Sequence, residues 1–247
     1  MPQQRTLLHA DAAWTVERVR KHAAPVQWSP AYQAASGRWV LPTDGVLEFQ
    51  LAGQTVLLDG LTALGLPQGQ PYQMRPLQPA EQTSVVVSAR PGASPWAAPQ
   101  VRVLSPRALL HLRAPWRSAE VLGAVLEPDA PPRPASATVA RARRFMALRV
   151  SAACGERWSL HDVADVAGCS AFHLAHLFRR HVGLSLHGYR QHLRMAAALQ
   201  RLEAGEADLA ALAHDLGYCS QSHLGAVFRR EVGVTLAQAR AALRAGI

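Results

Sequence analysis

Short apolar runs alternate with turn-forming residues over about the first hundred positions of the chain. Apolar runs at 38–41, 46–51, 54–58 and 84–89 are separated by turn signals such as Thr-Asp-Gly, Ala-Gly and Asp-Gly. Several short runs of this kind, with turns spaced by about 8–12 residues, are typical of an antiparallel sandwich or barrel. The pattern therefore predicts a β-rich N-terminal domain over residues 1–127.

The pattern becomes helical after Pro106, where residues 108–112 and 119–126 carry apolar side chains at helical spacing. Four prolines then fall within residues 128–134. Such a run can neither continue a helix nor join a central strand, because proline lacks the backbone donor that both require. We expect a proline-rich linker over 128–138 between two domains.

Residues 139–247 contain no proline, and their apolar periodicity is helical throughout. We expect a first helix over 141–150 and a capping box at Ser159–Asp162, where a serine precedes an acidic residue by three positions. Glycine is the usual helix terminator. We expect helices to end at five glycines: Gly168, Gly183, Gly205, Gly217 and Gly233.

This C-terminal part repeats itself. The segment Phe178-Arg-Arg-His-Val-Gly returns fifty positions later as Phe228-Arg-Arg-Glu-Val-Gly, and Cys169-Ser likewise matches Cys219-Ser. Upstream of the turn the offset is 49, since Gly168 matches Gly217, so the second turn has one extra residue. A unit that is used twice predicts two copies of one supersecondary element.

Each copy has the pattern of a helix-turn-helix unit. In the first, Ala164 allows the helices to cross closely, Gly168 ends the first helix, and Ser170 caps a second helix over 171–181. Leu174, Leu177 and Phe178 share its apolar face, as Leu224, Val227 and Phe228 do in the second copy. The opposite, N-terminal faces are then available to read base edges.

A long helix over about 185–202 joins the two copies. At 1.5 Å per residue it spans roughly 25–27 Å. That length suits two recognition helices held about one DNA turn, roughly 34 Å, apart. One chain would then enter two successive major grooves.

The charge distribution supports a polyanionic partner. The formal net charge is +9 and the sequence pI is about 10.6. Residues 1–132 hold 11 Lys and Arg against 9 Asp and Glu, whereas residues 133–247 hold 15 against 8. Because the excess of positive charge lies in the C-terminal part, nucleic acid is the first partner to consider.

Other sequence features indicate the cellular compartment. No stretch of 18 apolar residues is present, which excludes a transmembrane helix. The N-terminus breaks its apolar residues with His9, Asp11 and Glu17, unlike a signal peptide, so we expect a cytoplasmic protein. The cysteines Cys154, Cys169 and Cys219 fit a reducing compartment and lack the C-x-x-C spacing of a zinc site.

Residues 139–240 resemble the AraC/XylS family of transcription regulators. The first unit resembles that family in Val163-Ala164, Gly168-x-Ser170 and Leu174…Phe178. The joining helix does so in Arg194-x-x-x-Ala198. The second unit is the more diagnostic one, with Leu216-Gly-Tyr-x-Ser-Gln-Ser-His223 followed by Phe228-Arg-Arg.

The resemblance implies an all-α DNA-binding domain over 139–247 whose outward residues contact bases or phosphates. In recognition helix 1 these are Phe172, Ala175, His176, Arg179 and Arg180. In recognition helix 2 they are Gln221, Ser222, His223, Arg229 and Arg230.

The chain departs from the family pattern at four positions. Leu236 replaces a usual proline and Ala239 a usual aromatic residue, and both changes should alter the last helix without removing it. Gly225 and Ala226 replace longer polar residues, often arginine. In this interpretation the second unit reads fewer bases and mainly contacts the DNA backbone.

The histidines, arginines and cysteines of the two units can each be interpreted in two ways. His173 and His223 either bond locally at the helix start or touch DNA, and the local role is favoured for His173. The arginine pairs are either solvated charges or phosphate contacts, and phosphate contact is favoured beside two capped helices. The matched Cys169 and Cys219 suggest a disulfide, but two copies held that far apart exceed the ~7 Å Cα separation that it requires.

The N-terminal turns resemble the cupin-like jelly roll that many such regulators use for effector binding or dimerisation. Trp14, Trp28, Trp39 and Tyr72 either line a small-ligand cavity or form plain core, and core is favoured. Metal-dependent cupins use clustered histidines, whereas the histidines before residue 130 are His9, His22 and His111, none on a predicted strand. We therefore expect no metal, no cofactor and no catalytic residue.

Together these patterns predict an α+β protein with a β-rich cupin-like domain followed by an all-α domain with two helix-turn-helix units. The expected function is sequence-specific binding of double-stranded promoter DNA, as an activator that contacts RNA polymerase. A small-molecule effector and a second copy of the chain, in a homodimer, are possible partners. No association with a membrane is expected. The alternative is a cupin-type ligand-binding protein or enzyme whose helices mediate protein contacts.

Overall fold

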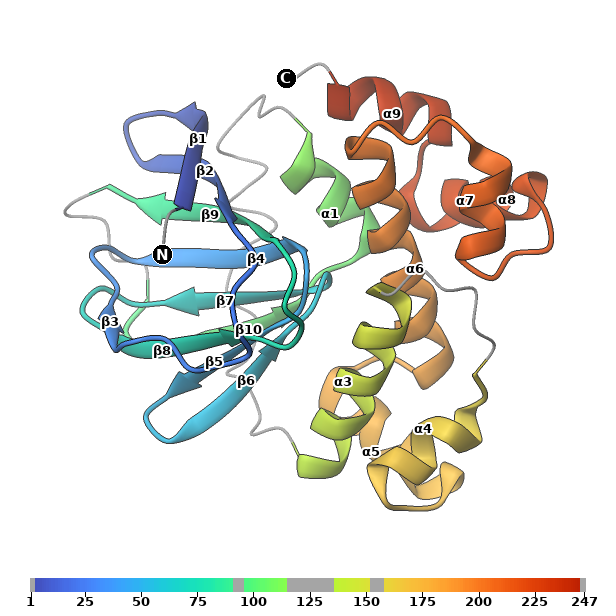
Figure 1. Ribbon diagram of the computed structural model, residues 1–247, viewed down its shortest axis with the longest axis horizontal. Helices are drawn as coiled ribbons and strands as arrows, with labels where there is room; N and C mark the ends of the chain where they lie inside the picture. Colours follow the sequence, from blue (N-terminus) through green and yellow to red (C-terminus); the bar gives the residue numbers. More distant parts are fainter. Residues whose placement is uncertain (1–2, 91–95, 115–135, 152–157, 245–247) are drawn as a thin grey trace. The chain divides into compact units, whose positions relative to one another are not determined.

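A computed structural model describes residues 3–90, 96–114, 136–151 and 158–244 of the chain (Figure 1). The chain divides into two compact units. The first consists of residues 1–104, 108–132 and 245–247, and the second of residues 105–107 and 133–244. The expected linker lies outside the described residues as far as residue 135, as does the helix expected over 119–126. We describe the two units separately.

The first unit is built from two antiparallel sheets. A six-stranded sheet has the order β1-β2-β9-β4-β7-β10, and a four-stranded sheet has the order β3-β8-β5-β6. The strands are β1 (Gln3–Ala10), β2 (Trp14–Lys21), β3 (Tyr32–Gln33), β4 (Arg38–Asp44), β5 (Leu47–Leu51), β6 (Gln54–Leu58), β7 (Thr62–Leu66), β8 (Pro71–Pro76), β9 (Gln82–Ala89) and β10 (Gln100–Val103). A helix, α1 (Pro106–Arg113), follows them. The expected β-rich domain is confirmed.

The hydrophobic core of this unit draws on both sheets. Val40, Leu64 and Val86 of the six-stranded sheet pack in one cluster with Leu47 and Phe49 of the four-stranded sheet. Both sheets contribute side chains to this cluster, which is how two packed antiparallel sheets bury a common core.

The four aromatic residues considered for a ligand cavity have separate surroundings. Trp39 is 1% exposed and packs on Trp96 at 5.4 Å between ring centroids. Tyr72 stacks on Phe49 at 5.6 Å. Trp14 also stacks on Trp96, and Trp28 lies under the Arg75 guanidinium at 4.5 Å. The core interpretation therefore describes Trp39 and Tyr72.

Strands β1 and β2 were not predicted from the pattern. They pair with each other, and β2 also pairs along its whole length with β9, from Trp14↔Ala89 to Lys21↔Gln82. A register shift in β1 between Leu7 and His9 breaks the simple alternation. The structure thus corrects one expectation, because His9 does lie on a strand; it contacts Asp11 at 3.2 Å.

The described residues of the second unit form helices joined by turns. Its helices are α3 (Ala137–Ser151), α4 (Leu160–Ala167), α5 (Ala171–Val182), α6 (Leu186–Glu203), α7 (Leu209–Asp215), α8 (Gln221–Val232) and α9 (Leu236–Arg244). The five glycines expected at helix ends all have positive φ, between 71° and 95°. Helix α3 begins four residues before the expected start at Arg141, and the last helix forms despite Leu236 and Ala239, both of which are buried.

Helix α6 is the central element of this unit. Its buried side chains include Tyr189, Leu193, Met195, Leu199 and Leu202, and it packs against α3, α5, α8 and α9. The pairs α4–α5 and α7–α8 lie toward the two ends of α6 (Figure 1). With 18 residues, α6 spans about 27 Å.

Candidate nucleic-acid interface

The first helix-turn-helix unit consists of α4, a short turn and α5. Ser159 caps α4 in a complete capping box: its Oγ accepts from the Asp162 N–H at 3.2 Å, and Asp162 Oδ2 accepts from the Ser159 N–H at 2.6 Å. The bond from the Ser159 N–H, with a second from the Ser159 hydroxyl at 3.0 Å, holds the pKa of the Asp162 carboxyl below its usual value. Ser170 Oγ then accepts from the His173 N–H and starts α5. The predicted caps are confirmed.

Helix α5 has two chemically different faces. Leu174 and Phe178 are fully buried, and Leu177 is half-buried. The five residues proposed for DNA contact are all exposed: Phe172, Ala175, His176, Arg179 and Arg180. The burial of the apolar face fixes the rotation of the helix, so this second face is turned outward.

The second unit, α7–turn–α8, repeats this arrangement. Asp208 caps α7 with two backbone bonds of 2.9 Å, and Ser220 Oγ accepts from the His223 N–H at 3.1 Å at the start of α8. Leu224, Val227 and Phe228 are buried. The five candidate residues of this helix are exposed: Gln221, Ser222, His223, Arg229 and Arg230.

Backbone hydrogen bonds show which residue is the extra one in the second turn. In the first unit the Cys169 N–H donates to the Ala164 carbonyl; in the second the Tyr218 N–H donates to the Ala213 carbonyl. Tyr218 therefore occupies the place of Cys169, and Cys219 is the added residue. This corrects the pairing of Cys169 with Cys219 that the sequence repeat indicated. It also explains why Cys219 is exposed whereas Cys169 is partly buried.

Helix α6 is joined to the first unit by aromatic and basic side chains. The Arg190 guanidinium lies 3.9 Å from the centre of the Trp158 ring and donates to the Trp158 carbonyl at 3.1 Å, just before the α4 cap. Tyr189 packs edge-on against Phe178 of α5 at 5.2 Å, and its hydroxyl accepts from Arg143 of α3 at 2.9 Å. These contacts hold α4 and α5 on one end of α6.

The same helix is joined to the second unit. Gln191 Nε2 donates to the Tyr218 hydroxyl at 2.7 Å, and Arg194 lies 5.4 Å from the ring of that tyrosine. Nearer its C-terminus, Arg201 bridges Asp215 of α7 at 3.2 Å and Glu206 at 2.6 Å. The bond from Arg201 lowers the pKa of Glu206. Arg190 and Gln191 are adjacent residues that hold opposite units.

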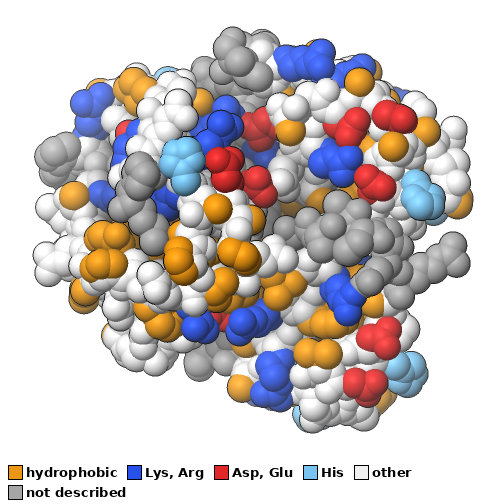
Figure 2. Space-filling view, viewed as in Figure 1, with side chains coloured by type: hydrophobic (Ala, Val, Ile, Leu, Met, Phe, Trp, Pro, Cys, Tyr) orange, Lys and Arg blue, Asp and Glu red, His pale blue; other side chains and the backbone are white. Residues whose placement is uncertain are grey.

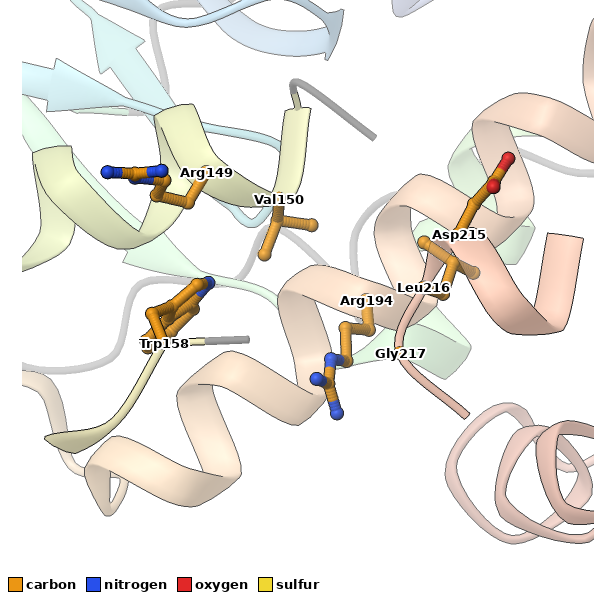
Figure 3. Close-up of a pocket in the computed structure, with 7 residues that line it drawn as sticks. All are labelled: Arg149, Val150, Trp158, Arg194, Asp215, Leu216 and Gly217. Atoms are coloured by element: carbon orange, nitrogen blue, oxygen red, sulfur yellow. The ribbon is translucent and has the colours of Figure 1, made fainter. Parts of the chain in front are cut away.

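A small pocket lies where these contacts meet. It is lined by Arg149, Val150 and Trp158 on one side and by Arg194, Asp215, Leu216 and Gly217 on the other (Figure 3). Gly217 has a φ of +76°, and a Cβ at this position would lie 2.7 Å from Arg194 Nη2. The positive φ favours glycine here, whereas the close atom is the far end of the flexible Arg194 side chain, which can shift.

Sequence reasoning missed most of these positioning residues. Arg141, Arg190, Gln191 and Arg201 were not singled out, although Arg141 Nη2 donates to the Ala167 carbonyl at the end of α4. The one available signal was Arg194, which stands in the motif of the joining helix. Amphipathic periodicity identifies a buried face but says nothing of which partner a polar residue reaches.

Charges on the helical unit are interspersed on the face shown in Figure 2. Arg230 pairs with Glu231 at 2.8 Å, and Glu231 also lies 3.5 Å from His192 of α6. Burial lowers the pKa of His192 below 6.5, against the opposing effect of Glu231. We judge His192 to be mainly neutral near neutral pH, because desolvation is the larger effect.

The two matched histidines differ in their surroundings. His223 Nδ1 lies 3.2 Å from Cys219 Sγ, and its ring packs edge-on against Tyr218 at 5.2 Å. A local contact of the kind considered for His173 is thus seen at His223, and it leaves the His223 side chain exposed. The His173 side chain is exposed.

Two kinds of feature are absent from the described part of the chain. There, no group of three or more His, Cys, Asp or Glu side chains is placed to hold a metal ion. Nor do the described helices include one with the length and apolar character to cross a membrane.

Comparison with known proteins supports a DNA-binding domain. Residues 163–242 match the family model described as "Helix-turn-helix domain", which covers both units from α4 to α9. No curated protein sequence matches the chain.

Three solved structures that are similar to this chain differ in sequence identity and in the share of the chain that they cover. A transcriptional regulator from Chromobacterium violaceum, described as having an AraC-type DNA-binding domain, has 25% identity and a TM-score of 0.39, covering 42% of this chain and 89% of its own. The DNA-binding domain of AdpA, solved with a target DNA, has 25% identity and a TM-score of 0.38, covering 42% and 94%. ToxT from Vibrio cholerae has 10% identity and a TM-score of 0.41, covering 94% and 99%.

Two capped units on one joining helix, together with the family match, define a DNA-binding transcription regulator with a double helix-turn-helix domain. Within that class, the motifs of the two units and of the joining helix resemble those of the AraC type.

Proposed function

We propose that the protein is a transcription activator that binds double-stranded promoter DNA by placing α5 and α8 in successive major grooves. One observation carries the proposal: both helices bury their apolar face and expose the N-terminal face that reads bases in helix-turn-helix proteins. Helix α6 is common to both, and its length of about 27 Å suits grooves about 34 Å apart.

The candidate residues divide into two roles. Phe172, Ala175 and His176 of α5, with Gln221, Ser222 and His223 of α8, are assigned to base edges because they occupy the N-terminal half of each helix. Four arginines further along are assigned to phosphates, which fix register on the duplex without specifying sequence. They are Arg179, Arg180, Arg229 and Arg230.

The phosphate contacts are unequal in the second unit. Arg230 has to give up its bond to Glu231 before it reaches a phosphate. Arg229 is exposed, and the described residues offer its side chain no hydrogen bond or ion pair. Arg229 is therefore the better phosphate ligand of the two.

The remaining parts of the chain have proposed roles in regulation. Residues 1–127 would form an effector-binding or dimerisation domain, residues 128–138 a linker, and residues 139–247 the DNA-binding domain. We further propose contact with RNA polymerase, residence in the cytoplasm and no catalytic activity. The alternative of a ligand-binding protein or enzyme with interaction helices is not favoured, because residues 163–242 match a helix-turn-helix family.

A salt titration of the full chain tests this proposal. Duplexes selected from a random pool should bind with an affinity that falls log-linearly with salt concentration, with a slope of about −0.9 for each phosphate contact. An affinity that does not depend on salt would refute the assigned phosphate contacts, and failure to select any sequence would refute DNA binding. A protein-contact helix pair would give that result.

A further inference from the structure

Phe172 is the most exposed large hydrophobic side chain of the described residues. It is the second residue of α5 and is 87% exposed, compared with 62% for Leu7, the next in order. Leu174 and Phe178 of the same helix are fully buried. An aromatic ring held in water at this position is unfavourable unless a partner covers it.

The helix cannot turn this ring inward. The Ser170 cap fixes the first turn through its bond to the His173 N–H at 3.3 Å. The burial of Leu174 and Phe178 then fixes the rotation about the helix axis. Residues at i+3, i+4 and i+7 from Phe172 share its side of the helix, and all three are exposed: Ala175, His176 and Arg179.

The composition of this face indicates what covers it. A hydrophobic N-terminal end followed by a basic C-terminal end suits a surface that is apolar at one point and anionic beside it. The major groove has this character at every A·T pair, because the C5 methyl group of thymine projects into the groove between the phosphate backbones. Phenylalanine and alanine are side chains that contact this methyl group.

We propose that Phe172 contacts a thymine methyl group in the major groove and makes the first unit selective for thymine. The inference rests on the proposed DNA binding and adds the chemical feature that α5 reads. A protein partner would also cover an exposed ring, but the arginines at the far end of this face favour a polyanion.

The second unit lacks this feature. Ser222 occupies the position of Phe172 at the offset of fifty, and Gln221 precedes it. Both side chains are polar hydrogen-bonding groups, and both are exposed. The target site should therefore be asymmetric, with methyl dependence only in the part that α5 contacts.

Replacement of single thymines by deoxyuridine tests the proposal, since only the methyl group is lost. With the full chain and its selected duplex, one or two thymines on one side of the site should each lower affinity about fourfold when replaced, the factor expected for one buried methyl group. The variant Phe172→Ala should bind thymine and deoxyuridine duplexes equally. The matched variant Ser222→Ala should keep the difference.

The outcomes separate the inference from the function on which it rests. If the protein binds its duplex but shows no thymine-to-deoxyuridine difference anywhere, the inference is overturned and DNA binding stands. A difference that persists in Phe172→Ala also overturns it. If no duplex is bound at all, the proposed function fails. Because the Phe172 side chain is exposed, the Phe172→Ala variant should unfold at the same temperature as the parent chain. That measurement verifies that the variant is folded.

Discussion

Gln191 donates a hydrogen bond of 2.7 Å to the hydroxyl of Tyr218, and this contact joins the N-terminal third of α6 to the turn of the second unit. Tyr218 is 6% exposed and lies beside Arg194 of the same helix. The second turn is one residue longer than the first, and the Gln191–Tyr218 bond anchors it to α6.

We expect Gln191→Ala and Tyr218→Phe to be coupled in a double-mutant cycle on the free energy of unfolding. A partly buried neutral hydrogen bond contributes about 1 kcal/mol net, so the double variant should lose about that much less than the sum of the two single variants. Urea denaturation of the full chain measures the effect. Additive losses would mean that the bond makes no net contribution.

Arg229→Ala should weaken binding to all duplexes to a similar degree and reduce the slope of log affinity against log salt by about one unit. The reason is the loss of one phosphate contact. Arg5→Ala, which removes the same charge from β1 of the other unit, is the matched control and should leave the slope unchanged. Equal effects of the two variants would indicate a response to net charge alone.

His176→Ala should change sequence preference rather than overall affinity for DNA. The side chain is exposed one helical turn after Phe172, on the face assigned to base edges. Selection from a random pool with the parent chain and the variant would show a relaxed requirement at one or two base pairs. An identical preferred sequence would contradict the assignment of His176 to base contact.

Gly225→Ala should stabilise the protein by about 1 kcal/mol. Gly225 lies in the interior of α8, and no heavy atom outside its own helix and chain neighbours lies within 4 Å of a Cβ built on it. Alanine reduces the conformational freedom of the unfolded chain without meeting a neighbour. Ala226→Gly, at the next position, should destabilise by a similar amount. No stabilisation in the first variant would show that α8 is strained at this point.

Protonation of His192 should destabilise the fold as the pH falls. Burial holds the pKa of His192 below its unfolded value of about 6.5, so the folded state binds fewer protons between those two values. Its contribution to stability is therefore complete above pH 6.5. The contribution is lost as the pH falls from there through the lower, folded pKa.

The free energy of unfolding measured from pH 7.5 downward would show this loss, and His192→Gln should reduce it. Glu231→Gln removes the group that favours the protonated form, so it should deepen the loss. The interpretation fails if His192→Gln leaves the pH profile unchanged.

Much of the helical unit was predictable from the sequence because its signals are local. A serine cap and the N–H that it binds lie three residues apart, as Ser159 and Asp162 or Ser170 and His173 do. A glycine that ends a helix acts on its own backbone. The exposed candidate face follows from the burial of its opposite face, since the helical period relates the two.

The β unit was predicted only where strand and turn are neighbours in the chain. The hairpin of β5 and β6 is of this kind. The pairing of β2 with β9 joins residues more than sixty positions apart, and β1 is an edge strand whose residues are mostly exposed. Neither leaves a local pattern of alternation, so both were missed.

The sequence alone determined that two capped helices would expose matching faces, because caps, stops and periodicity act within a few residues of one chain segment. Only the tertiary structure decided that Tyr218 takes the place of Cys169, and that Arg190 and Gln191 hold opposite units. Those contacts depend on which residues meet across packed helices. That is a property of three-dimensional position, which residue spacing within one helix does not encode.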